Sequence, residues 1–73
     1  MNKEEKKNKF KRLAVHRVEQ AVHYIELIGN LSNQRDYEYT TEDVKKIKNA
    51  LNNALKSMED RFSRRVRKSK FEL

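Results

Sequence analysis

The sequence contains no cysteine, no proline and no tryptophan, and its single glycine is Gly29. Without cysteine, neither a disulfide nor a thiolate zinc site can stabilise the fold. Without proline and with one glycine, the chain has few positions at which a helix must end. It also has no glycine-rich phosphate loop and no serine, histidine and acid grouping for nucleophilic catalysis. We therefore expect a helical protein that is not an enzyme and that needs no cofactor.

Long apolar runs are absent as well. No segment approaches the roughly 20 apolar residues that a membrane-spanning helix requires. The first residues, MNKEEKKNKFKR, are charged and are not followed by the apolar stretch of a signal peptide. We expect no stable membrane insertion and a cytoplasmic location.

A chain of 73 residues forms one domain at most and buries only a small fraction of its surface when it folds alone. Small helical chains without disulfides or metals usually gain stability by self-association. We therefore expect a single domain, residues 1–73, that forms a homo-oligomer.

Apolar residues recur at spacings of three and four in two segments, which is the pattern of amphipathic helices. The first segment predicts a helix over about residues 5–33. Its seam residues are Ala14, Val18, Ala21, Ile25 and Ile28. The second predicts a helix over about residues 41–68. Its apolar stripe consists of Val44, Ile47, Leu51, Ala54/Leu55, Met58, Phe62 and Val66.

The second helix has a clear start signal in YEYTTEDV. Thr40 followed by Asp43 is the spacing of a capping box, and Glu42 adds a second acid in the first turn. The segment 34–40 is then a turn, short enough to make the two helices antiparallel. The expected fold is an all-α helical hairpin that dimerises into a four-helix bundle.

Positive charge is concentrated at both ends of the chain, whose formal net charge is +7. Residues 1–12 carry six basic and two acidic side chains, a net +4, and residues 61–73 carry six and one, a net +5. Residues 13–60 carry a net −2. A hairpin would bring the two basic ends together, where like charges repel unless an anionic partner neutralises them.

This patch is predicted to bind RNA or DNA, because basic clusters bind the phosphate backbone and arginine matches phosphate oxygens with two parallel hydrogen bonds. The candidate phosphate contacts are Lys7, Lys11, Arg12, Arg61, Arg64, Arg65, Arg67 and Lys68. Two alternatives stay open. The cations could simply be solvated helix ends, or they could adsorb to an anionic membrane with Phe62, Val66 and Phe71 as the apolar side.

His16 and His23 each lie three residues before a glutamate. Histidine and glutamate one turn apart can hold a metal ion, but the second helix offers no matching histidine. We expect solvated pairs rather than a metal site, with a pH-sensitive dimer contact as a further alternative.

Three consecutive motifs surround the turn: LIGNLSN (Leu27 to Asn33), YEYT (Tyr37 to Thr40) and the acidic helix start Thr41 to Val44. In these motifs the chain resembles a group of small helical proteins of bacteria and mobile elements. The resemblance covers about half of the chain and carries no activity with it. It implies that the turn is a shared structural or contact element and that the protein belongs to a phage, plasmid or integrated element.

The rival to nucleic-acid binding is therefore a protein-interaction module that presents the turn, with Tyr37 and Tyr39, or the outer face of the first helix to a host or phage protein. For Tyr39 in particular, closure of the apolar end of the bundle is the favoured interpretation.

Overall fold

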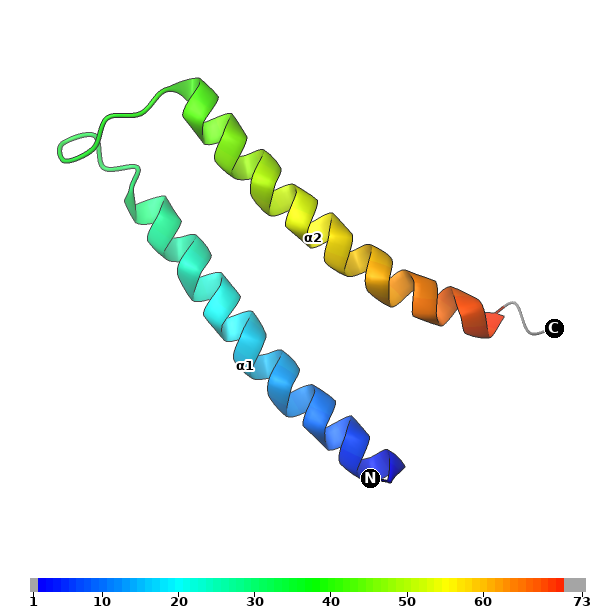
Figure 1. The fold of residues 1–73 in the computed structure, drawn as a ribbon. Coiled ribbons are helices and arrows are strands. Elements are labelled where there is room, and N and C mark those ends of the chain that lie inside the picture. Colours follow the sequence, from blue (N-terminus) through cyan, green and yellow to red (C-terminus); the bar gives the residue numbers. More distant parts are fainter. Residues whose placement is uncertain (1, 71–73) are drawn as a thin grey trace. The chain divides into compact units, whose positions relative to one another are not determined.

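The computed structural model describes the backbone of residues 2–70 and the side chains of residues 2–65. The described chain forms two helices, α1 (Lys3–Asn30) and α2 (Thr41–Lys70), and contains no strand (Figure 1). The all-α class and the two long helices are therefore confirmed.

The chain divides into two units, Met1–Glu38 and Tyr39–Leu73. The first contains α1 and most of the interhelical turn, and the second contains the end of the turn and α2. Each unit is described separately below.

The first turn of α1 is capped by Asn2. Its Oδ1 accepts a hydrogen bond from the backbone N–H of Glu5 at 2.8 Å, and the Lys6 N–H donates to the Asn2 carbonyl at 3.1 Å. Glu4 and Glu5 add negative charge at the positive end of the helix dipole. Because Asn2 satisfies one of the otherwise unpaired N–H groups, α1 begins two residues earlier than the expected start at about residue 5.

The end of α1 differs from the sequence expectation. The predicted extension to about residue 33 is wrong, because α1 ends at Asn30. The N–H groups of Leu31 and Ser32 donate to the carbonyls three residues back, those of Ile28 and Gly29, each at 3.0 Å. These bonds tighten the last turn into 3₁₀ geometry, which satisfies two terminal carbonyls without a left-handed residue.

Asn33 organises the turn that follows. Its carbonyl accepts from the backbone N–H groups of Asp36 at 3.2 Å and Tyr37 at 3.0 Å. Its side chain accepts from the Arg35 N–H at 3.0 Å and donates from Nδ2 to Asp36 Oδ2 at 2.9 Å. Asparagine competes with helical hydrogen bonding in this way, and this explains why the helix does not continue through residue 33.

The start of α2 is a reciprocal capping box. Thr40 Oγ1 accepts from the Asp43 N–H at 3.1 Å, and Asp43 Oδ2 accepts from the Thr40 N–H at 2.9 Å. The prediction of a helix start here, with Thr40 capping through Asp43, is confirmed. Glu42 and Asp43 both lie in the first turn, where the helix dipole favours acids.

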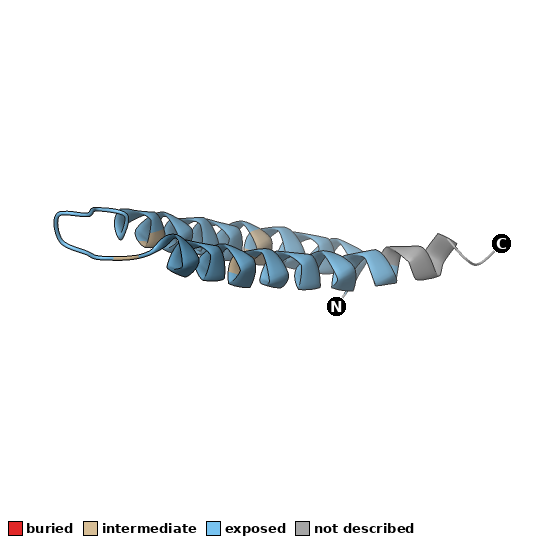
Figure 2. Cartoon of the chain, turned by 90° about the horizontal axis from the view of Figure 1, so that it is seen from above, coloured by how far each residue is buried: buried red, intermediate tan, exposed pale blue. Residues whose placement is uncertain are grey.

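No residue in the part of the chain whose side chains are described is buried (Figure 2). The residues of intermediate exposure are Leu13, Ala14, Ile28, Tyr39 and Leu51. Other apolar side chains remain about half exposed, for example Val18 at 59% on α1 and Leu55 at 52% on α2. Over the described residues, most of the apolar stripe of each helix is thus exposed to solvent.

Candidate nucleic-acid interface

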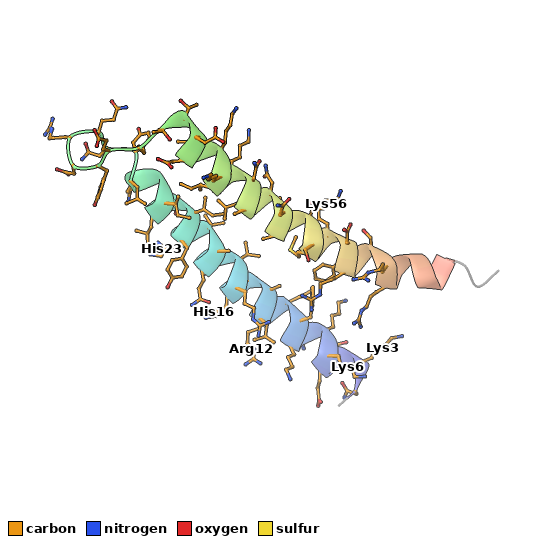
Figure 3. All side chains as sticks on the ribbon, turned by 45° about the horizontal axis from the view of Figure 1, so that its top comes forward. Lys3, Lys6, Arg12, His16, His23 and Lys56 are labelled. Atoms are coloured by element: carbon orange, nitrogen blue, oxygen red, sulfur yellow. The ribbon has the colours of Figure 1, made fainter. Side chains whose placement is uncertain are left out.

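The predicted phosphate contacts on α1 lie on two different faces. Lys7 and Lys11 are four residues apart on an unbroken helix, so they project from the same face. Arg12 projects from another side of α1, together with His16 and His23 (Figure 3). The structure therefore brings Lys7 and Lys11 together and separates Arg12 from them.

On α2, Arg61 and Arg65 are also four residues apart and share a face. Arg64 lies on the neighbouring face, and its Nε donates to the Asp60 carbonyl at 3.4 Å. All three arginines are exposed. Arg67 and Lys68 belong to α2, but their side chains lie outside the described residues. The prediction that these two residues contact phosphate therefore concerns side chains that the structure does not describe.

The paired cations are not neutralised within their own helices. Within the described residues of α1 and of α2, no carboxylate of the same helix pairs with Lys7, Lys11, Arg61 or Arg65. Like charges four residues apart on a helix repel each other modestly. A phosphate bound between such a pair would remove the repulsion and would gain charge-assisted hydrogen bonds.

In both helices a cationic pair stands seven residues from a pair of apolar stripe residues, a relation that charge counts by segment do not contain. Lys7 and Lys11 precede the seam residues Ala14 and Val18 by seven positions each. Arg61 and Arg65 follow Ala54 and Met58 by seven. Because seven residues complete nearly two helical turns, the cations lie beside the apolar stripe of their own helix, which itself continues at Phe62 in α2.

The turn presents one tyrosine to solvent. Tyr37 is 50% exposed, and its backbone N–H is fixed to the Asn33 carbonyl at 3.0 Å. Tyr39, next to the capping residue Thr40, is only of intermediate exposure. Of the two tyrosines, Tyr37 is the one whose ring and hydroxyl are available to a partner.

The histidines of α1 show no metal-binding arrangement. His23 stacks at a tilt of 58° on the ring of Tyr24, with the ring centroids 5.9 Å apart. Across the part of the chain that the structure describes, no group of three or more His, Cys, Asp or Glu side chains could hold a metal ion.

Neither helix, over its described residues, has the length and apolar character needed to cross a membrane. Comparisons of the chain with models of known families, with curated proteins and with solved structures find no match.

Proposed function

We propose that the protein is a small non-catalytic regulator that binds RNA or DNA through its basic terminal segments, residues 1–12 and 61–73. The observation that carries this proposal is the distribution of charge. The two segments hold all of the excess positive charge, +4 and +5, while the stretch between them is slightly acidic. A protein that used cations only for solubility would gain as much from an even distribution.

Two features favour phosphate as the anionic group. Four of the six cations in residues 61–73 are arginines, whose planar fork matches phosphate oxygens. The described cations also lie on regular helices, which hold neighbouring positive charges at fixed intervals of about 6 Å per four residues. Contacts of this kind read the backbone and the shape of a nucleic acid rather than its sequence.

We further propose that the functional form is a homodimeric four-helix bundle of antiparallel hairpins. The support is the exposed apolar stripe on each helix, which a second copy of the chain would cover. Full burial of a valine or leucine side chain stabilises by about 1.5–3 kcal/mol, so covering the remaining half of each exposed side chain contributes about 1 kcal/mol. In an antiparallel hairpin the two basic segments lie at the same end.

The proposal is tested by fluorescence anisotropy with a labelled RNA duplex, a DNA duplex and single-stranded DNA, each at about 50 and 200 mM salt. Neutralisation of four to eight phosphates, at a slope of about 0.9 per contact, predicts a loss of affinity of about 10²–10⁴ between these salt concentrations. The triple variant Arg64→Ala, Arg65→Ala, Arg67→Ala should abolish binding at the higher salt.

A matched control lies at the other end of α2. Lys45, Lys46 and Lys48 also carry three positive charges, and they lie near the turn, outside the basic segments. Their triple alanine variant has the same net charge as the arginine variant and should retain most of the affinity. Equal losses in both variants, or no binding by the unaltered protein, would contradict the proposal.

A second candidate function is supported by the ordered turn. Tyr37 is half exposed on a backbone fixed by Asn33, as expected of a contact residue held in place before binding. The resemblance of this turn to mobile-element proteins favours a host or phage protein as the partner. Such an interaction should be lost on Tyr37→Ala, be retained in the arginine variant and depend little on salt.

A further inference from the structure

The side of α1 that faces away from its apolar stripe carries a row of polar and basic side chains. Because α1 is one continuous helix, residues at intervals of three and four lie on one face. Figure 3 shows Arg12, His16 and His23 on the same side of α1. We call this side the outer face of α1, and its row consists of Lys9, Arg12, His16, Gln20 and His23.

This outer face stays accessible when helices pair. All five side chains of the row are exposed. The seam residue Ala14 projects about 160° around the helix from His16, since each residue advances the helix by about 100°. Amphipathic helices pack through their apolar stripes, so an assembly built on the stripe of α1 leaves the row in water.

The row is a linear array of hydrogen-bond donors. Lysine, arginine and glutamine side chains donate to phosphate oxygens, and a protonated histidine donates from both ring nitrogens. From Lys9 to His23 the array contains about one donor per helical turn and is about 21 Å long, at 1.5 Å per residue. Such an array suits a linear polyanion better than an isolated small anion.

The charge of the row depends on its two histidines. Histidine is the side chain whose charge normally changes between about pH 5 and 8, whereas glutamates stay ionised there. The charged residues within one turn of the histidines are Arg12 and Glu19 for His16, and Glu19 and Glu26 for His23. Together with Lys9, Arg12 and Glu19, the row has a net charge of +1 with neutral histidines and +3 with both histidines protonated.

We propose that the outer face of α1 binds the phosphate backbone of a nucleic acid through Lys9 and Arg12 and, at acidic pH, through His16 and His23 as well. This inference rests on the proposed nucleic-acid binding. It extends the interface beyond residue 12 and makes its affinity depend on pH. A bound phosphate favours the protonated imidazole, so affinity rises as the pH falls, by about three- to tenfold for each histidine contact.

The test is anisotropy with the RNA duplex, the DNA duplex and single-stranded DNA over a salt series, at about pH 5.5 and about pH 8. Each phosphate contact contributes about 0.9 to the slope of log K against log salt on duplex DNA and about 0.7 on single strands. Two histidine contacts should therefore make the slope of the unaltered protein steeper at the lower pH by about 1.4–1.8. The three nucleic acids also separate the possible sources of the phosphate backbone.

Two double variants assign the pH dependence to the histidines. His16→Gln with His23→Gln should lose the difference in slope, and any pH dependence that remains measures other groups, because the chain has no further histidine. His16→Arg with His23→Arg fixes both positive charges. This second variant should bind at about pH 8 as tightly as the unaltered protein binds at about pH 5.5.

A pair of single variants tests the face itself. Arg12→Ala removes an arginine from the row, and Arg17→Ala removes one that projects about 140° around the helix from Arg12. Arg12→Ala should lower the slope by about 0.7–0.9 and Arg17→Ala by less than about 0.3. Circular dichroism should show unchanged helicity in all four variants, since alanine, glutamine and arginine are good helix formers.

The proposal and the function on which it rests fail differently. An equal slope of the unaltered protein at both pH values would overturn the assignment of the outer face while leaving nucleic-acid binding intact. The same holds if the glutamine variant keeps the full pH dependence, or if Arg12→Ala and Arg17→Ala lower the slope equally. Absence of binding by the unaltered protein at both pH values would instead overturn the proposed function.

Discussion

Replacing Thr40 by alanine removes one half of the reciprocal cap at the start of α2. The Thr40 hydroxyl accepts from the Asp43 N–H at 3.1 Å, and the Asp43 carboxylate accepts from the Thr40 N–H at 2.9 Å. Loss of a threonine cap costs about 0.5–2 kcal/mol of stability, typically about 1 kcal/mol. Asp43→Ala removes the other bond and also the favourable interaction with the helix dipole, a further 0.3–1 kcal/mol or so.

The free energy of unfolding is measured by urea titration followed by circular dichroism at 222 nm. Protein concentration is held constant, because stability depends on it in a self-associating chain. With a slope of about 1 kcal/mol per molar urea, Thr40→Ala should lower the midpoint by about 1 M. The double variant Thr40→Ala, Asp43→Ala should lose less than the sum of the two single losses, because the two side chains belong to one motif.

Thr40→Ser is the matched control, since it keeps the hydroxyl and caps at least as well. Its midpoint should stay within a few tenths of a molar of the unaltered protein. If Thr40→Ala and Thr40→Ser unfold at the same urea concentration, the hydrogen bonds at this helix start do not stabilise the protein, and the reasoning about the cap is refuted.

Three further predictions concern other parts of the chain. Gly29→Ala should stabilise the protein by about 0.5–1 kcal/mol in the same urea assay. The reason is that Gly29 lies in α1 without a positive φ, and a Cβ added there meets nothing within 4 Å. Destabilisation would show that the position is crowded in the assembly. Asn33→Ala should cost about 1 kcal/mol by loss of the bonds to Arg35 and Asp36, and an unchanged midpoint would contradict the role given to Asn33. Leu55→Lys should convert the proposed dimer to monomer in sedimentation equilibrium, because a charge would then be buried in the interface. Asn53→Lys, at an exposed polar position, should leave the dimer intact. A dimer that survives Leu55→Lys would show that this part of the α2 stripe is not in the interface.

The helix boundaries that could be predicted are those set by strong local signals. The start of α2 was predicted because Thr40 and Asp43 are three residues apart, the spacing of a local capping motif that forms without tertiary contacts. The same kind of signal, Asn2 followed three residues later by Glu5, marks the start of α1. It is harder to recognise in the sequence, because a lysine-rich segment without apolar residues separates it from Phe10. The end of α1 was misplaced because Leu31 fits the apolar spacing, and periodicity gave no weight to the competing bonds of Asn33.

The candidate site was predictable as a concentration of charge but not as a surface. Counting by segment grouped Arg12 with Lys7 and Lys11, although the helix directs it to the side that carries His16 and His23 (Figure 3). Charge counts contain no information on faces, and only the register of a continuous helix supplies it. The same register places Arg61 and Arg65 beside the apolar stripe of α2, each one residue before Phe62 and Val66 in the sequence.

The most direct test of the central claim is the salt dependence of the dissociation constant for the unaltered protein on a nucleic-acid duplex, measured by anisotropy. If the basic terminal segments hold the phosphate backbone, the slope of log K against log salt should be about −4 to −7, as four to eight contacts at about 0.9 each require. A slope near zero, or no binding at about 50 mM salt, would contradict the claim that these segments are a nucleic-acid interface.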